Sequence, residues 1–108
     1  MLSCLIAEDE AITGMALADA VAEAHFRVLG PFSRCSAVLD TLDQVTPDAA
    51  ILDVKLQDGP SIAIALRERS VPFVVCSGHR RSDVPPAFAD APWVEKPATP
   101  TEVLALQL

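Results

Sequence analysis

The sequence predicts an α/β protein built on an open parallel sheet. Five short, almost continuous apolar runs are separated by segments with helical patterning, and such runs are typical of strands buried on both faces. Because strand and helix alternate, right-handed crossovers place the helices on both sides of the sheet. This indicates a doubly wound, flavodoxin-like (βα)5 fold with the strand order 2-1-3-4-5. At 108 residues the chain, 1–108, is expected to form a single domain.

The apolar runs give the expected strands, and the segments between them give the helices. The strands are expected at residues 2–7, 27–32, 49–54, 72–77 and 91–95. The first helix follows the first strand, with an apolar stripe made of Ile12, Met15, Ala16, Ala20 and Ala24. Ser33 is expected to cap the second helix, and Gly59-Pro60 to open the third.

The C-terminal part of the chain departs from this regular alternation. The segment between Ser77 and Pro92 contains Pro85-Pro86 and lacks a clean helical stripe, so a short or irregular fourth helix is expected. Thr99 and Glu102 form a capping box for a last helix of about two turns.

Charge and cysteine content narrow the class of protein. A net charge of -7 argues against a nucleic-acid surface, which needs a basic patch. The three cysteines have no metal-ligand spacing, and two lie within apolar runs, which indicates a reducing compartment. The N-terminus lacks the basic flank of a signal peptide, and no apolar run reaches the ~20 residues of a membrane span. We therefore expect a cytoplasmic protein without a membrane partner.

Chemically active side chains stand where four of the expected strands end. They are Glu8, Asp9 and Glu10 after the first strand, Asp53 at the third, Ser77 at the fourth and Lys96 at the fifth. In an open α/β sheet, ligands bind at this carboxyl edge. Taken singly, each residue has an ordinary explanation as a helix cap, a turn residue or a solvated charge, and Glu10 is assigned to that explanation.

Taken together, these side chains indicate phosphoryl chemistry. Asp53 ends the apolar run "AAILD", so its carboxylate is expected to be half buried beside Glu8 and Asp9. Carboxylates within ~5 Å repel by ~1–3 kcal/mol unless a cation intervenes, and such a site suits Mg²⁺. A carboxylate nucleophile, a metal ion, an ammonium group and a hydroxyl are what phosphoryl transfer to an aspartate requires.

Four segments at strand ends carry a resemblance to a known family. They are "LIAEDE" (5–10), "AAILDVKLQDG" (49–59), "VVCSG" (74–78) and "WVEKP" (93–97). With these segments in this order, the chain resembles the receiver domain of bacterial two-component response regulators over essentially its whole length. The "SGH" and "APWVEKP" patterns are similar to a subset of stand-alone receivers with an unusual fourth helix.

The resemblance implies a role for each of these residues. Asp53 would be the phosphoacceptor, and Mg²⁺ would be held by Glu8, Asp9, Asp53 and the backbone carbonyl of Lys55. Lys96 would contact the phosphoryl group, Ser77 would be the switch hydroxyl, and the Lys96–Pro97 bond would be cis. Glu8 stands where aspartate is commoner, and Trp93 where tyrosine or phenylalanine is usual. Trp93 is therefore either the switch aromatic or a plain core or interface residue.

The implied partners are a sensor histidine kinase or histidine phosphotransfer protein and a downstream protein target; a homodimer stays open. The protein would be a phosphoacceptor in a two-component phosphorelay and not a conventional enzyme.

Two alternatives stay open from the residues. One is a receiver-like interaction module that is not phosphorylated. The other is a nucleotide- or flavin-binding enzyme, disfavoured because the first strand–helix turn is acidic and lacks glycine. The absence of a second aspartate two residues after Asp53 likewise disfavours a dehalogenase-type phosphatase. His25 and His79 are expected to be helix-end or loop residues.

Overall fold

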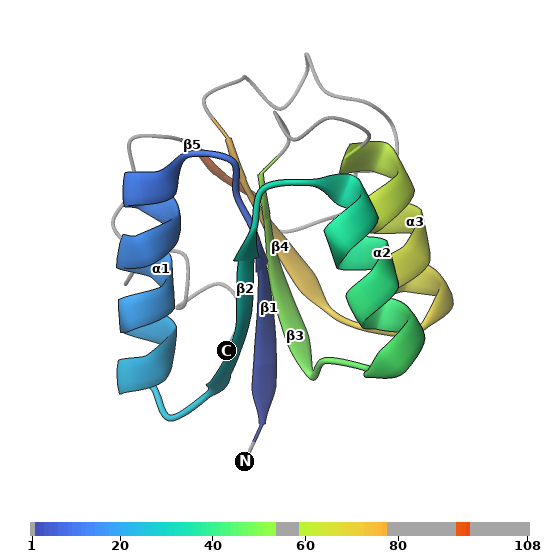
Figure 1. Ribbon diagram of the computed structural model, residues 1–108, viewed down its shortest axis with the longest axis horizontal. Helices are drawn as coiled ribbons and strands as arrows, with labels where there is room; N and C mark the ends of the chain where they lie inside the picture. The colour runs from blue at the N-terminus through green and yellow to red at the C-terminus, as the bar shows by residue number, and fades with distance from the viewer. Residues whose placement is uncertain (1, 54–58, 78–92, 96–108) are drawn as a thin grey trace.

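The computed structural model is a parallel five-stranded sheet with helices on both faces (Figure 1). The structure describes residues 2–53, 59–77 and 93–95; of residues 59, 77 and 93–95 it describes the backbone alone. The elements are β1 (Ser3–Ala7), α1 (Ala11–Glu23), β2 (Arg27–Phe32), α2 (Cys35–Gln44), β3 (Ala49–Asp53), α3 (Gly59–Glu68), β4 (Phe73–Ser77) and β5 (Trp93–Glu95). The sheet order β2-β1-β3-β4-β5 confirms the predicted fold and strand order.

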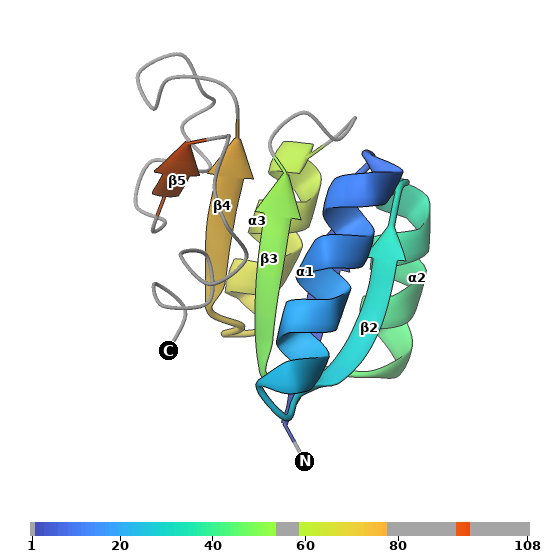
Figure 2. The same cartoon turned by 90° about the vertical axis from the view of Figure 1, so that its left-hand side faces the viewer.

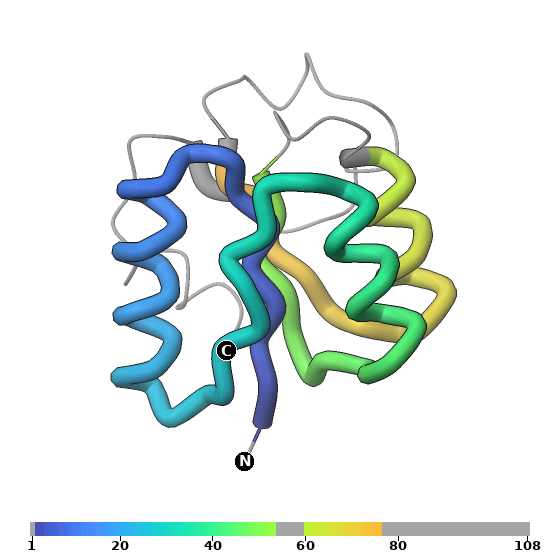
Figure 3. The backbone as a smooth tube through the Cα atoms, viewed as in Figure 1, coloured from blue at the N-terminus to red at the C-terminus, as the bar shows by residue number. Residues whose placement is uncertain are grey.

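The apolar strands supply two core layers, because successive side chains of a strand point to opposite faces. On one face, Leu5 and Leu52 pack with residues of α2 and α3. On the other face, Ile6 and Ile51 pack with Leu17 of α1. The backbone trace shows the same division, with α1 on one side of the sheet and α2 and α3 on the other (Figure 3).

The strands differ in burial according to their place in the sheet. In β3 every residue is buried, and β1 is buried from its second residue on. β2 has only exposed and partly buried residues, because it forms an edge of the sheet. The expectation of strands buried on both faces therefore fails for β2. The ends of β1 and β4 also differ slightly from prediction, since Leu2 and Pro72 lie just outside them.

The stripe predicted for α1 is wrong. Ile12 and Met15 are 81% and 65% exposed, and the residues that α1 buries are Gly14, Leu17 and Val21. The helix is so rich in alanine that two of its faces carry similar apolar patterns. The face that packs on the sheet is the one on which Gly14 permits a close approach to β2.

The start of α2 also differs from prediction, whereas that of α3 agrees with it. The N-cap position of α2 is Arg34, without a side-chain capping bond within the described residues, so Ser33 does not cap this helix. α3 begins at Gly59, with Pro60 in its first turn as predicted.

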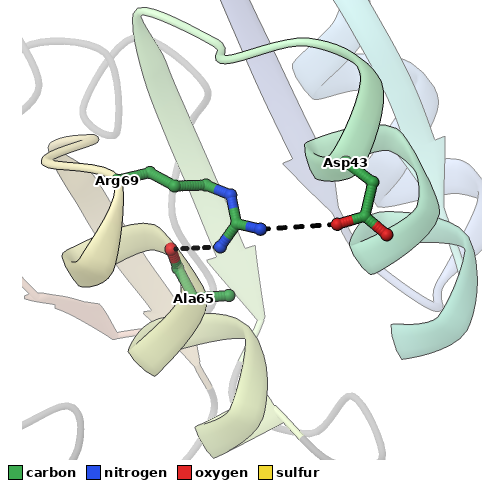
Figure 4. Close-up of polar contacts among 3 residues, drawn as sticks. All are labelled: Asp43, Ala65 and Arg69. Atoms are coloured by element: carbon green, nitrogen blue, oxygen red, sulfur yellow. Dashed lines mark hydrogen bonds and ion pairs between the residues drawn. The ribbon is translucent and has the colours of Figure 1, made fainter.

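Arg69, just after α3, links this helix to α2. It donates from Nη1 to the carbonyl of Ala65 (3.1 Å) and from Nη2 to Asp43 Oδ1 (3.5 Å), as Figure 4 shows.

Several predicted features lie outside the described residues. They are the irregular fourth helix, the last helix, His79, and the side chains of Lys55, Lys96 and Pro97. His25 lies at the end of α1 with a positive φ of 67°, in agreement with its prediction as a helix-end residue. Within the described ranges, none of the helices has the length and apolar character that a membrane crossing needs.

Candidate functional site

Three carboxylates meet at the carboxyl edge of the sheet. Glu8 and Asp9 follow β1, and Asp53 is the last residue of β3. β1 and β3 are neighbours, with Ala7 paired to Leu52, so the register brings Asp53 beside the start of the Glu8-Asp9 turn. The arrowheads of β3, β4 and β5 point to this same edge in Figure 2. The predicted convergence of the first and third strand ends is confirmed.

The three carboxylates are close to one another and unequally exposed. One carboxylate oxygen from each of Glu8, Asp9 and Asp53 lies within 4.8 Å of the others. Glu8 is 3% and Asp53 1% exposed, whereas Asp9 faces solvent. Asp53 is thus more deeply buried than the half-buried position that its sequence predicts, because β3 lies in the middle of the sheet.

Backbone hydrogen bonds fix the position of Glu8. Its N–H donates to the carbonyl of Phe32 at the end of β2 (2.9 Å), and its Oε1 accepts the N–H of Glu10 (3.1 Å). Glu10 itself stands at the N-cap position of α1, but its side chain makes no capping bond among the described residues. Glu10 therefore contributes its backbone to this site, and its exposed carboxylate at the start of α1 agrees with its assignment as an ordinary helix-start residue.

The chemistry of this donor set fits a hard divalent cation. Carboxylate oxygens are the ligands that Mg²⁺ and Ca²⁺ use, and one exposed carboxylate leaves a solvent-facing side for waters or a phosphoryl group. Two buried carboxylates and a third close by also repel one another, and a divalent ion relieves that repulsion.

The other predicted site residues are described in part or not at all. The backbone of Ser77 ends β4 next to the strand that holds Asp53, since Asp53 pairs with Cys76. β5 continues the edge, with Ser77 paired to Glu95 and Val75 to Trp93. The side chains of Ser77 and Trp93, like Lys55, Lys96 and Pro97, lie outside what the structure describes.

The sequence alone gives the Gly30–Pro31 pair, within the second expected strand, no chemical role. In the structure its peptide bond is cis, and the β1–β2 pairing shifts at this point, directly before the Phe32 carbonyl that holds Glu8. A glycine next to a proline inside an apolar strand is the signal that could have revealed a bulge.

Solved structures similar to this chain cover nearly all of it. SdrG from Sphingomonas melonis Fr1 aligns at 32% identity and a TM-score of 0.80, over 98% of this chain and 95% of that one. A response regulator receiver protein from Sinorhizobium medicae WSM419 aligns at 26% identity and a TM-score of 0.81, over 98% and 90%. The chain belongs to the receiver domains of response regulators.

A third comparison extends the likeness of this receiver domain at the level of fold. A response regulator protein from Burkholderia pseudomallei with a phosphorylated aspartic acid, calcium ion and citrate has a TM-score of 0.86 at 16% identity, over 100% of this chain and 67% of that one. No protein-family model matches the chain, and no curated protein sequence matches it. The receiver domain thus has the family fold, with an acidic cluster at its carboxyl edge.

Proposed function

We propose that this receiver domain accepts a phosphoryl group on Asp53 from a phosphohistidine and thereby changes its affinity for a protein partner. The observation that carries the proposal is the buried carboxylate of Asp53 within 4.8 Å of those of Glu8 and Asp9. Membership in the receiver family supports it, as does the phosphorylated aspartic acid of the Burkholderia protein. The domain acts as a signalling element that is modified in each cycle, unlike a conventional turnover enzyme.

The transfer exchanges one bond to phosphorus for another. A carboxylate oxygen of Asp53 forms the O–P bond while the N–P bond of the donor breaks, and the leaving imidazole takes up a proton. Mg²⁺, when bound, would neutralise charge on the phosphoryl oxygens.

Each remaining residue has a proposed role at this edge. Glu8, Asp9, Asp53 and the backbone carbonyl of Lys55 would hold Mg²⁺. The ammonium group of Lys96 would contact the phosphoryl oxygens, and the turn at Pro97 would orient it. The position of Ser77, at the end of the strand beside Asp53, supports a hydrogen bond from its hydroxyl to the phosphoryl group.

The response to phosphorylation would run through the surface of residues 77–95. A new charge at Asp53 biases a two-state element when one of its states offers a better hydrogen bond to the phosphoryl group. Ser77 would supply that bond, and Trp93, two strand positions before Glu95, would be the aromatic residue that moves with it.

The proposed donor is a sensor histidine kinase or a histidine phosphotransfer protein. Ile12 and Met15, in the first two turns of α1, form an exposed apolar surface that begins three residues after Asp9. Apolar residues exposed beside a reactive site favour a protein contact there. We expect Met15→Ala to slow transfer from the protein donor and to leave labelling by a small phosphodonor unchanged.

Labelling by a small phosphodonor such as acetyl phosphate tests the function directly. We expect phosphoryl incorporation into the wild-type chain in Mg²⁺, loss of incorporation in EDTA, and none into Asp53→Asn. Asp40→Asn, at an exposed carboxylate of α2, is the matched control and should label normally. Equal labelling of the wild-type chain and Asp53→Asn would contradict the proposal.

A further inference from the structure

Near the acidic site, the edge strand β2 has one residue more than the stretch of β1 with which it pairs. Leu5 pairs with Leu29, but Ala7 pairs with Phe32, so two steps along β1 correspond to three along β2. The extra residue falls at Gly30–Pro31. Such a bulge re-aims the residues that follow it, and here it brings the Phe32 carbonyl to the N–H of Glu8 (2.9 Å).

The same bulge places Pro31 against α1. A Cβ on Gly14 would lie 3.1 Å from Pro31 Cβ and 3.2 Å from Pro31 Cγ, closer than side chains usually pack, and 3.7 Å from Glu8 Cγ. Gly14 is buried, and its lack of a side chain lets α1 approach the bulge and the stem of Glu8 together.

Gly14 is also joined to the Glu8 carboxylate through the backbone. The N–H of Gly14 donates to the carbonyl of Glu10 (2.9 Å), and the N–H of Glu10 donates to Glu8 Oε1 (3.1 Å). Two hydrogen bonds that anchor Glu8 therefore come from the two elements that touch at Gly14 and Pro31. One comes from β2, through the Phe32 carbonyl, and the other from the start of α1, through the N–H of Glu10. A shift of α1 away from β2 would separate these anchors.

We infer that the contact between Gly14 and Pro31 is a positioning element, which sets where the Glu8 carboxylate stands relative to Asp9 and Asp53 and hence how tightly the site binds a divalent cation. The inference rests on the proposed metal site. Glu8 has one methylene more than aspartate. The absence of a side chain at Gly14 leaves room for it, since a Cβ on Gly14 would lie 3.7 Å from Glu8 Cγ. Groups that orient ligands without touching the metal typically change its affinity by about 10–100-fold when altered.

Titration with Mn²⁺, with free ion followed by electron paramagnetic resonance, tests the inference. We expect Gly14→Ala to weaken Mn²⁺ binding about tenfold, although alanine favours helix more than glycine does. Pro31→Gly, which removes the surface that Gly14 packs on, should weaken binding in the same direction. Ala16→Ser adds one heavy atom at an exposed position of the same helix and should leave the affinity unchanged.

A double-mutant cycle with Glu8→Ala separates positioning from general damage. If Gly14 acts through Glu8, then Gly14→Ala changes the Mn²⁺ affinity less than about twofold once Glu8 is removed, because the displaced ligand is already absent. The same holds for Pro31→Gly, which carries the test if Gly14→Ala does not fold.

The outcomes distinguish this inference from the function on which it rests. A wild-type chain that binds no Mn²⁺ would overturn the metal site, and the positioning role with it. A wild-type chain that binds Mn²⁺, with folded variants that bind it equally well or lose affinity equally in the Glu8→Ala background, would overturn the positioning role alone.

Discussion

The carboxylates of Glu8 and Asp53 lie side by side in the interior of the fold, with an oxygen of each within 4.8 Å of the other and exposures of only 3% and 1%. Such a pair is costly for the fold, because burial weakens the solvation of both charges and proximity makes them repel. Glu8 is held in this place by two backbone partners, Phe32 and Glu10. The arrangement is consistent with a site that gives up stability in the cation-free state for function.

Neutralising Asp53 should therefore stabilise the protein when no divalent cation is present. We expect Asp53→Asn to raise the free energy of unfolding by about 1–2 kcal/mol in EDTA, since asparagine keeps the shape and removes the repulsion. Urea unfolding at low salt measures it. Asp40→Asn, an exposed change of the same chemistry, should stay within about 0.5 kcal/mol of wild type. A destabilised Asp53→Asn would contradict this account of the carboxylate pair.

The bulge in β2 depends on the glycine at its first position. Gly30 has a φ of 105°, and a Cβ there would lie 2.7 Å from the Ile6 carbonyl oxygen. Gly30→Ala should cost about 2–4 kcal/mol of unfolding free energy, because it adds backbone strain and a clash with main-chain atoms. Ser33→Ala, three residues on, should cost less than about 0.5 kcal/mol, since Arg34 and not Ser33 occupies the N-cap of α2. Chemical denaturation of both variants tests the contrast, and equal losses would contradict it.

Arg69 is expected to contribute to stability mainly through its hydrogen bond to the Ala65 carbonyl and less through its ion pair with Asp43. Its bond to Ala65 is short and partly buried, whereas its contact with Asp43 is long and the Asp43 side chain is 73% exposed. Arg69→Met should cost about 1 kcal/mol, and Asp43→Asn less than about 0.5 kcal/mol. Thermal unfolding of the two variants compares them. A larger loss in Asp43→Asn would show that the ion pair dominates.

Cys4 should make the free energy of unfolding decrease as the pH becomes alkaline. Burial raises the pKa of its thiol from 9.0 to about 12, so the folded state holds a proton that the unfolded state has lost. The stability this contributes is fully present below pH 9 and is lost as the pH rises toward 12. Between about pH 8 and pH 10 the wild type should lose about 1.4 kcal/mol more than Cys4→Ala does. Urea unfolding at the two pH values measures this. Equal losses of unfolding free energy in the wild type and in Cys4→Ala would contradict the raised pKa of Cys4.

The overall fold could be predicted because its signal is local. The apolar runs of β1, β3 and β4 are nearly continuous and identify buried parallel strands. Right-handed crossovers then restrict the fold to a few doubly wound sheets, of which the flavodoxin-like one has the observed order. The face of α1 could not be predicted in the same way. Ile12 and Met15 suggest one stripe and Leu17 and Val21 another, and helical periodicity alone does not choose between them. The buried face is the one on which Gly14 allows α1 to approach β2 closely. A contact of this kind leaves no periodic pattern in the sequence.

The acidic cluster was predictable because parallel strands carry Glu8, Asp9 and Asp53 to one edge. The depth of Asp53 and the anchoring of Glu8 were not. Both depend on neighbours distant in sequence: Asp53 on the central place of β3, and Glu8 on a bulge that moves Phe32 into reach. Bulges arise from the pairing of two strands, so a single strand's pattern only hints at them through Gly30 and Pro31.

The central claim is that Asp53 carries the phosphoryl group, and locating the modified residue tests it most directly. After treatment with a small phosphodonor in Mg²⁺, reduction with borohydride converts a phosphorylated aspartate into homoserine, which peptide mass spectrometry can locate. We predict homoserine at residue 53 of the wild-type chain and at no other acidic residue. Homoserine at Asp9 or another aspartate, or 2-amino-5-hydroxypentanoic acid (the corresponding product of a phosphorylated glutamate) at Glu8, with residue 53 unmodified, would contradict the assignment of Asp53 as the phosphoacceptor.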